Sequence, residues 1–133
     1  MNIQLPPPLT LPEMTRTDFV RYQGASGDMN PVHHDEGFAK AAGLPAPLAV
    51  GMYAAGALCA WASDALGPEH VRRSRIRWKK MCFPGAVLTL SGEVVEERTS
   101  EGVIHASLEL KATDQDGEVA VLAWMSFELP ERT

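Results

Sequence analysis

The side chains best suited to chemistry lie in one short segment, SGDMNPVH at residues 26–33. This segment contains a carboxylate (Asp28), an amide (Asn30) and an imidazole (His33). Carboxylates and imidazoles are the side chains that most often move protons in enzymes. Pro31 holds the residue before it in the extended region of backbone space, which stiffens the segment. The sequence therefore predicts a stiff loop that brings together groups able to carry out chemistry.

Each of these residues also has a plainer interpretation. An Asp in such a loop is often only a turn or helix-capping residue, and Asn30 could be purely structural. His34 directly follows His33, and neighbouring side chains in an extended chain point in opposite directions. We therefore expect one imidazole in the site, and the spacing from Pro31 favours His33. The cluster of the two histidines with Asp35 lacks the spacing of common zinc sites, so no metal is expected.

The flanking residues predict the helices that hold this loop. Thr15 and Asp18 match a capping box for a short helix that ends near Gly24. Asp35 can cap a second short helix. The most apolar stretch, residues 51–66, predicts a buried helix whose alanines allow close approach to a sheet.

The second half of the chain changes to the period of strands. Four runs rich in Val, Ile, Leu, Thr, Trp and Phe are separated by turn signals, and they cover residues 73–82, 87–97, 103–113 and 118–129. The last two connections are short enough to make neighbouring strands antiparallel. Helices followed by such a meander predict an α+β fold in which the sheet wraps around the long helix.

Composition sets the class of protein. The 133 residues predict a single domain, 1–133, and 45% hydrophobic with 22% charged residues is typical of a folded globular chain. A net charge of -5 disfavours a general nucleic-acid binder.

Cys59 and Cys82 lie in apolar surroundings, without CxxC spacing, and are expected in the core. With no signal-peptide pattern in residues 1–9, this favours a cytoplasmic location. Residues 41–63 carry no charge, but glycines and prolines interrupt them, so no membrane span is expected.

The loop resembles a known family signature. The run S-G-D-x-N-P-x-H at residues 26–33 is similar to that of MaoC-like (R)-specific enoyl-CoA hydratases and the related (3R)-hydroxyacyl-ACP dehydratases. The resemblance continues in AVGM at residues 49–52, where the family often has A-H-G-M, and in RW at 77–78 with PG at 84–85. It implies a hotdog fold, in which an antiparallel sheet wraps a long central helix.

The resemblance also implies an activity and a set of site residues. Asp28 and His33 would be catalytic, Ser26 and Asn30 would support the loop, and the backbone N–H of Gly51 would bind the thioester oxygen. The implied reaction is the reversible hydration of a trans-2-enoyl thioester to the (3R)-3-hydroxyacyl thioester. The acyl carrier would be CoA or an acyl carrier protein, and no metal or redox cofactor is implied. Val50 stands where the family often has histidine, which alters the packing or polarity of the pocket but leaves the Gly51 amide.

A basic strip lies further along the chain. Six of the twelve Lys and Arg residues fall within residues 72–80, and strand alternation places Arg73, Arg75, Arg77 and Lys79 on one face. One interpretation is a solvated outer face with salt-bridge partners. The other is attraction for the phosphates of CoA or for an acidic carrier protein.

Two other function classes remain open, and an oligomer is expected. The chain could be a hotdog thioesterase, although the loop at residues 26–33 disfavours this, or a non-catalytic subunit that completes another chain's pocket. An open sheet edge must be paired or covered, so we expect a homodimer or a heterodimer with a similar subunit, with the acyl pocket near the interface.

Overall fold

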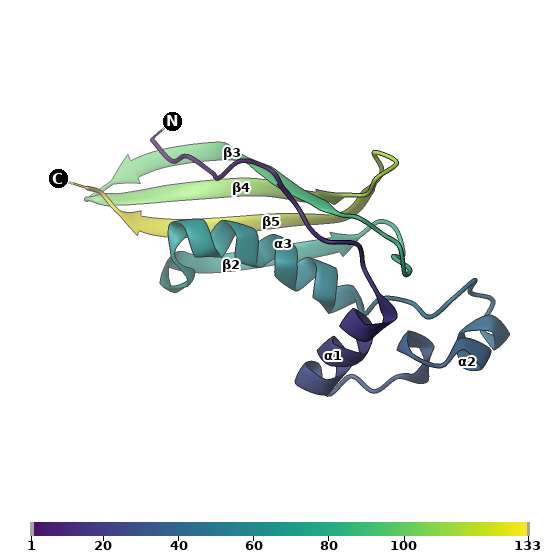
Figure 1. The fold of residues 1–133 in the computed structure, drawn as a ribbon. Coiled ribbons are helices and arrows are strands. Elements are labelled where there is room, and N and C mark those ends of the chain that lie inside the picture. The colour runs from purple at the N-terminus through teal and green to yellow at the C-terminus, as the bar shows by residue number, and fades with distance from the viewer. Residues whose placement is uncertain (1, 133) are drawn as a thin grey trace.

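An antiparallel five-stranded sheet curves around one long helix (Figure 1). The computed structural model describes residues 2–132. The strand order across the sheet is β1-β3-β4-β5-β2, with β1 Leu9–Thr10, β2 Val71–Trp78, β3 Thr89–Ser100, β4 Val103–Thr113 and β5 Val119–Pro130. The helices are α1 Arg16–Ser26, α2 Glu36–Ala41 and α3 Gly51–Leu66, joined by two 3-10 turns, η1 Pro31–His33 and η2 Pro68–His70. Every neighbouring pair of strands is antiparallel.

The helix α3 forms the core together with the concave face of the sheet. Its buried positions are mostly alanine, with Leu58 and Trp61 as the larger side chains. They pack in one apolar cluster with the inward residues of β3, β4 and β5, among them Leu110 and Phe127. Small side chains let the helix axis approach the sheet closely. The predicted buried helix and wrapped sheet are therefore confirmed.

The boundaries of several elements differ from those predicted. The helix α1 continues past Gly24 to Ser26, because Gly27, at a φ of 79°, supplies the left-handed residue that ends it. β2 ends at Trp78 rather than at residue 82, because the N–H groups of Lys79 and Lys80 both turn to the Ala120 carbonyl. The predicted capping box at Thr15 and the Asp35 cap are both present.

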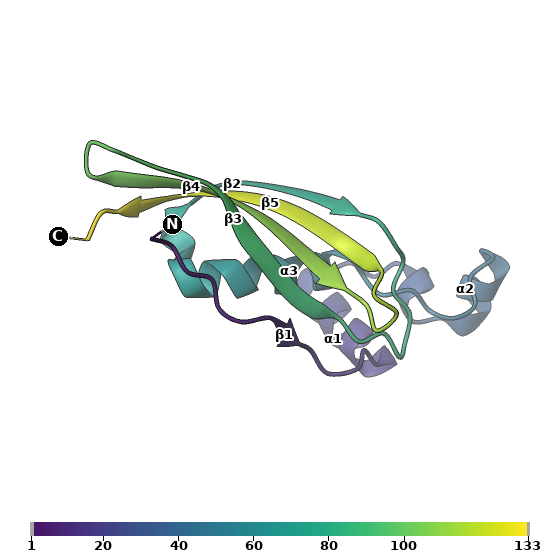
Figure 2. The same ribbon diagram turned by 90° about the horizontal axis from the view of Figure 1, so that it is seen from above.

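The two edges of the sheet are treated differently. Residues 2–14 run along the β3 side of the sheet, where Leu11 and Met14 donate backbone hydrogen bonds to the Leu88 and Ala86 carbonyls (Figure 2). β2 pairs only with β5, so the other side of this eight-residue strand has no partner strand within the described residues. No helix among residues 2–132 has the length and apolar character needed to cross a membrane.

Figure 1 shows α1 and α2 gathered beyond the end of α3 at which α3 begins. The loop predicted to carry the chemistry lies between α1 and α2. The fold therefore brings that loop next to the N-terminus of its central helix.

Candidate active site

The loop that follows α1 is held by local hydrogen bonds. The backbone N–H of Asp28 donates to Ser26 Oγ (3.2 Å), and that of Asn30 donates to Asp28 Oδ1 (3.3 Å). Asn30 has a φ of -58° and a ψ of 124°, the extended conformation expected before a proline, and its Oδ1 accepts from the Val32 N–H to cap η1. Ser26 and Asn30 are therefore placed as supports of the loop, in line with their predicted role.

Asp28 and His33 face each other across this loop. Asp28 Oδ2 lies 3.7 Å from His33 Nε2, too far for a direct hydrogen bond but close enough for one water molecule to contact both. The His33 side chain is only 9% exposed, whereas that of Asp28 is 45% exposed. The pair thus joins a buried imidazole to a carboxylate at the solvent side.

A distant backbone group fixes the tautomer of His33. Its Nδ1 lies 2.6 Å from the Leu48 carbonyl oxygen, which can only accept a hydrogen bond. Nδ1 therefore carries the proton, and in the neutral ring Nε2 keeps the free lone pair that faces Asp28. The structure thus turns Nε2 of His33, and not Nδ1, towards Asp28.

A buried glutamine that the sequence prediction missed braces the same loop. Gln23, only 2% exposed, donates from Nε2 to the carbonyls of Asp28 (2.9 Å) and Asn30 (3.1 Å). Its Oε1 accepts from Nδ1 of His34 (3.0 Å). His34 thus contacts the amide of Gln23, whereas His33 faces Asp28. The two rings point apart although the chain is not extended there, because His33 closes a 3-10 turn.

The N-terminus of α3 presents backbone donors, of which the Tyr53 N–H bonds to the Val50 carbonyl (3.0 Å). Gly51 is the first residue of the helix, and no side chain caps the helix at Val50. The first N–H groups of a helix lack intrahelical acceptors and carry the positive end of the helix dipole. The indole of Trp78 donates from Nε1 to the Gly51 carbonyl (2.8 Å), and a Cβ on Gly51 would lie 3.1 Å from that nitrogen. Glycine is thus what allows Trp78 to cover the start of α3.

A cavity of about 530 Å³ lies between the His33 side of the loop and the start of α3. Its lining is largely apolar and comes from η1, the start of α3 and the end of β2, with the residues His33, Leu48, Ala49, Val50, Gly51, Ala54, Trp78, Lys79, Lys80, Met81, Cys82 and Val121. Such a size and lining suit a small organic group bound beside a few polar atoms. Val50 takes part in the wall and is buried, so an apolar side chain fills the place of the frequent family histidine.

The charged groups near the cavity have separate roles. Lys80 binds the carboxylates of Asp114 (2.6 Å) and Glu118, and these bonds raise the pKa of Lys80 and lower that of Asp114. Lys79 lines the cavity and takes part in no ion pair within residues 2–132. Burial raises the pKa of the Cys59 thiol and of the Cys82 thiol. Both side chains are therefore held in the protonated, unreactive form.

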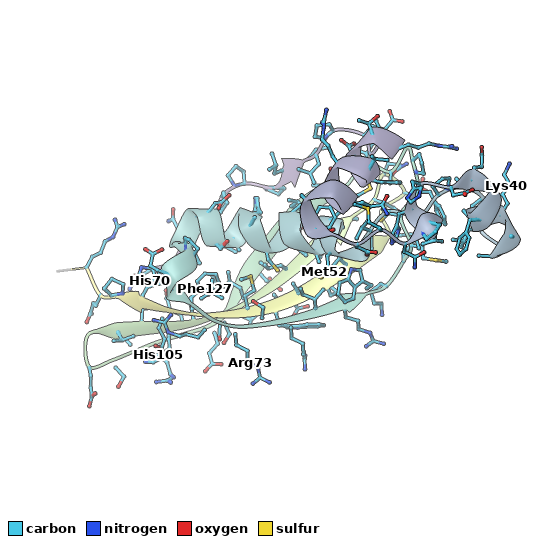
Figure 3. All side chains as sticks on the ribbon, turned by 90° about the horizontal axis from the view of Figure 1, so that it is seen from below. Lys40, Met52, His70, Arg73, His105 and Phe127 are labelled. Carbon is cyan, nitrogen blue, oxygen red and sulfur yellow. The ribbon has the colours of Figure 1, made fainter. Side chains whose placement is uncertain are left out.

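The three arginines predicted to bind phosphate are not brought to this cavity. Arg73, Arg75 and Arg77 project from the outer face of β2, and Figure 3 shows Arg73 on the side of the sheet away from α3. Ile76, between them, packs on the core instead. Within one chain, the predicted catalytic residues and Gly51 come together, and the arginines stay apart.

The arrangement defines a class: a hotdog-fold domain with an Asp–His pair near the N-terminus of its central helix. The model of the protein family described as MaoC like domain matches residues 4–116 of this chain. The chain belongs to this family. The family predicted from the loop is therefore confirmed.

Known proteins support both the fold and the family. A 3-hydroxyacyl-thioester dehydratase X of Mycobacterium tuberculosis is 38% identical over 77 residues, which cover 58% of this chain and 27% of that protein. The (R)-hydratase from A. caviae involved in PHA biosynthesis has a TM-score of 0.80 at 22% identity, covering 97% of this chain and 98% of that one. The ChsH1-ChsH2 complex from Mycobacterium tuberculosis has a TM-score of 0.77 at 24% identity, covering 99% and 100%.

These similarities differ in what they cover. The two curated relatives that the chain matches are longer proteins, of which it spans 5% and 27%. The solved structures are matched over nearly their whole length, at identities that establish the fold. The hotdog fold predicted for the chain is confirmed by them.

Proposed function

We propose that this MaoC-like domain hydrates a trans-2-enoyl thioester to the (3R)-3-hydroxyacyl thioester, and dehydrates the product in the reverse direction. One observation carries the proposal: His33 and Gly51 line the same cavity, and Asp28 lies 3.7 Å from the free nitrogen of His33. A proton-transfer pair and a set of backbone donors are the two things that this reaction needs.

The chemistry follows from these groups. Water adds its oxygen to C3 of the enoyl group, and a proton is added to C2. A water between Asp28 and His33 loses one proton to this pair, and the pair returns a proton to C2, so none is gained or lost overall. Negative charge develops on the thioester oxygen, where the Gly51 N–H and the start of α3 stabilise it. No step requires a metal or a redox cofactor.

The carrier of the acyl group is CoA or an acyl carrier protein in this proposal. Both attach the acyl chain through a phosphopantetheine thioester, so both bring phosphate towards the mouth of the cavity. Lys79 is the cation of the cavity wall that no carboxylate occupies within the described residues, and we assign the phosphate contact to it.

The proposal includes assembly with a second subunit of the same fold in the cytoplasm. The open edge at β2 supports this, because an exposed row of backbone groups is normally paired or covered. One of the similar structures, with a TM-score of 0.77, was solved as the ChsH1-ChsH2 complex.

The test is an ultraviolet assay of the purified chain, alone and with added partner subunits, on enoyl-CoA substrates of short, long and ring-bearing acyl groups. Loss of the conjugated enoyl-thioester absorbance, with formation of the (3R) product, is the expected result. The substrate that is consumed fastest identifies the acyl class.

The same samples distinguish the other two functions. A thioesterase would release free thiol from a saturated acyl-CoA, which a thiol reagent detects. A non-catalytic subunit would show neither reaction alone and would raise the activity of its partner even after Asp28→Asn. Either outcome would contradict catalysis by Asp28 and His33.

A further inference from the structure

The backbone at the start of α3 is anchored on both sides of one free donor. The Ala49 N–H, two residues before the helix begins, donates to the Cys82 carbonyl (2.9 Å). The Gly51 carbonyl accepts from Nε1 of Trp78 (2.8 Å). The Gly51 N–H itself makes no hydrogen bond within residues 2–132. The donor therefore stays available while the chain around it is held.

The usual way to fix the start of a helix would place an oxygen at this end. A Ser, Thr, Asp or Asn at the N-cap accepts a hydrogen bond from an N–H of the first turn. Such an oxygen would compete with a ligand oxygen for the positive end of the helix. The N-cap of α3 is Val50, which has no such group, and the indole of Trp78 bonds to a carbonyl of the first turn instead. The helix start is thus fixed without use of its donors.

The close approach of Trp78 requires glycine at position 51. A Cβ on Gly51 would lie 3.1 Å from Nε1 of the indole and 3.5 and 3.6 Å from two of its ring carbons. Gly51 is not among the glycines with a positive φ, and glycine is a poor residue for the interior of a helix. The reason for glycine at the start of α3 is therefore the room that it leaves for the indole.

The sheet holds Trp78 on its other side. Trp78 is the last residue of β2 and lies opposite Val121 on β5. The N–H groups of the next two residues both donate to the Ala120 carbonyl, at 2.8 and 3.3 Å. Trp78, Val121 and Gly51 all line the candidate cavity. The indole thus connects the start of the central helix to the rigid sheet within the wall of the cavity.

We propose that Trp78 is a positioning residue for the oxygen-binding donor. Its indole holds the Gly51 carbonyl, so that the Gly51 N–H is already in place when negative charge develops on the thioester oxygen. Donors that need no movement during the reaction stabilise such charge best. The inference rests on the proposed function and adds to it a side chain that acts through the backbone of α3.

Two variants break the same hydrogen bond from its two ends. Trp78→Phe keeps an aromatic wall but removes the donor. Gly51→Ala keeps the backbone N–H, but its Cβ displaces the indole. Each should lower kcat for the enoyl-CoA about threefold to tenfold, the effect of one neutral hydrogen bond, with KM within about twofold of the wild type. The combined variant should be little worse than the poorer single one, because both changes remove one contact.

Matched controls make the same chemical changes elsewhere. Trp124→Phe removes the indole that lies under Arg75, which does not line the cavity. Gly56→Ala adds a Cβ within α3 where nothing lies within 4 Å. Both controls should leave kcat unchanged. All variants are measured in the assembly in which the wild type is active, and circular dichroism checks their folding. If one of the two test variants does not fold, the other still tests the bond.

A measurement without turnover separates this role from the reaction. Butyryl-CoA labelled with ¹³C at the thioester carbonyl has no double bond to hydrate. Its carbonyl resonance should move downfield when it binds the wild type, because hydrogen bonds polarise the C=O group. At saturating ligand the movement should be smaller in Trp78→Phe and in Gly51→Ala, and unchanged in Trp124→Phe and Gly56→Ala.

The possible failures are distinguishable. Equal carbonyl shifts in the wild type and in Trp78→Phe, or additive losses of kcat in the combined variant, would overturn the role of Trp78 and leave the proposed reaction intact. No downfield movement in the wild type would overturn both, because the thioester oxygen would then not meet these N–H groups. A loss of kcat in either control as large as that in Trp78→Phe would assign the effect to general packing.

Discussion

At the scale of single residues, the site depends on a few hydrogen bonds that connect its two halves. The carbonyl of Leu48 accepts from His33 Nδ1, while the Leu48 N–H donates to the Val32 carbonyl (3.0 Å). Leu48 lies three residues before Gly51, so the segment that orients the imidazole also leads into the helix that offers the backbone donors. His33 and the N-terminus of α3 are therefore positioned together by the same segment.

The first prediction concerns the proton-transfer pair. Asp28→Asn and His33→Ala should each lower kcat by roughly 10² to 10⁴, the usual contribution of a positioned acid or base. The melting temperature of Asp28→Asn should stay near that of the wild type, because Asn keeps the acceptor for the Asn30 N–H. The double variant should be little worse than the poorer single one, since both groups serve one proton transfer. A kcat for Asp28→Asn within a few-fold of the wild type would contradict the mechanism.

The second prediction concerns Gln23 as a positioning residue. Gln23→Leu should lower kcat about 10- to 100-fold with little change in KM, because the carbonyls of Asp28 and Asn30 lose their common donor. In an Asp28→Asn background the same change should cost almost nothing further, because Gln23 acts through the loop.

A matched control is Gln115→Leu. The side chain of Gln115 also makes two backbone hydrogen bonds, to Gly85 and Val87, in a different loop. Its loss should lower the melting temperature without lowering kcat. Additive losses of kcat for Gln23→Leu and Asp28→Asn would assign Gln23 a general structural role instead.

At the scale of elements, α3 and the sheet fit together through residues that lack side-chain bulk. Gly92 on β3 is the tightest point, where an added Cβ would come within 2.4 Å of Leu110 Cδ2 and 3.3 Å of the Trp61 ring. The Trp61 indole N–H is buried there without a hydrogen-bond partner among the described residues. The ring is thus held at this place by packing against Gly92 and its neighbours.

The third prediction follows from this packing. Gly92→Ala should lower the free energy of unfolding by about 1–3 kcal/mol, as expected for overpacking a filled core. Gly56→Ala is the matched control, because Gly56 lies within α3 with nothing within 4 Å of an added Cβ. It should raise the stability by up to about 1 kcal/mol through helix propensity. Urea unfolding of both variants gives the comparison, and equal effects would contradict the packing argument.

The fourth prediction concerns the turn between β4 and β5. Asp114 accepts from the backbone N–H groups of Asp116 and Glu118 and binds Lys80, and the Lys80 contact holds its pKa below the ordinary value. A lowered folded-state pKa gives stability that is present above the ordinary carboxyl pKa and is lost as the pH falls below it. Asp114→Asn, which loses the ion pair, should melt a few degrees below the wild type at pH 7, and the gap should close towards pH 2.

The control for this prediction is Asp116→Asn. Asp116 lies in the same turn, but only its backbone N–H takes part in these hydrogen bonds. Its carboxylate is therefore free to change without loss of the ion pair. The melting temperature of this variant should follow that of the wild type across the same pH range. A gap for Asp114→Asn that stays constant with pH would show that the ion pair does not cause it.

At the scale of the whole molecule, the two faces of the sheet separate two kinds of positive charge. Lys79 and Lys80 lie at the cavity, whereas Arg73, Arg75 and Arg77 lie on the outer face. The chain carries a net charge of -5, so these are local concentrations on an acidic protein. The two groups of cations can therefore be tested separately for binding to an anionic carrier.

The fifth prediction tests that separation. Lys79→Gln should raise the KM for an enoyl-CoA about three- to tenfold with kcat unchanged, and added salt should weaken wild-type binding in the same direction. A variant with Arg73→Gln, Arg75→Gln and Arg77→Gln should leave KM unchanged at matched oligomeric state, because these residues do not line the cavity. A raised KM in the arginine variant, with none for Lys79→Gln, would return the phosphate role to the strip.

Much of this organisation is set by interactions that are local in the sequence. The caps of α1 and α2, the stiff loop before Pro31 and the tight turn at Glu101 and Gly102 all depend on residues a few positions apart. Hydrophobic periodicity likewise requires only the chain itself, so the buried helix and the antiparallel meander could be predicted. The candidate site residues of the loop could be proposed from the sequence because they lie together in eight consecutive positions, 26–33.

The remaining features depend on residues that are distant in the chain, and only the tertiary structure decided them. The tautomer of His33 is set by a carbonyl fifteen residues away, and the end of β2 is set by the Ala120 carbonyl on another strand. No pattern marks Gln23 as a buried brace, because its partners are backbone carbonyls that any sequence offers. Alternation grouped the arginines of β2 on one face, but packing of Ile76 on the core determined that this face is the outer one. Local sequence fixes which residues share a face or a turn, and the burial of apolar surface decides where that face points.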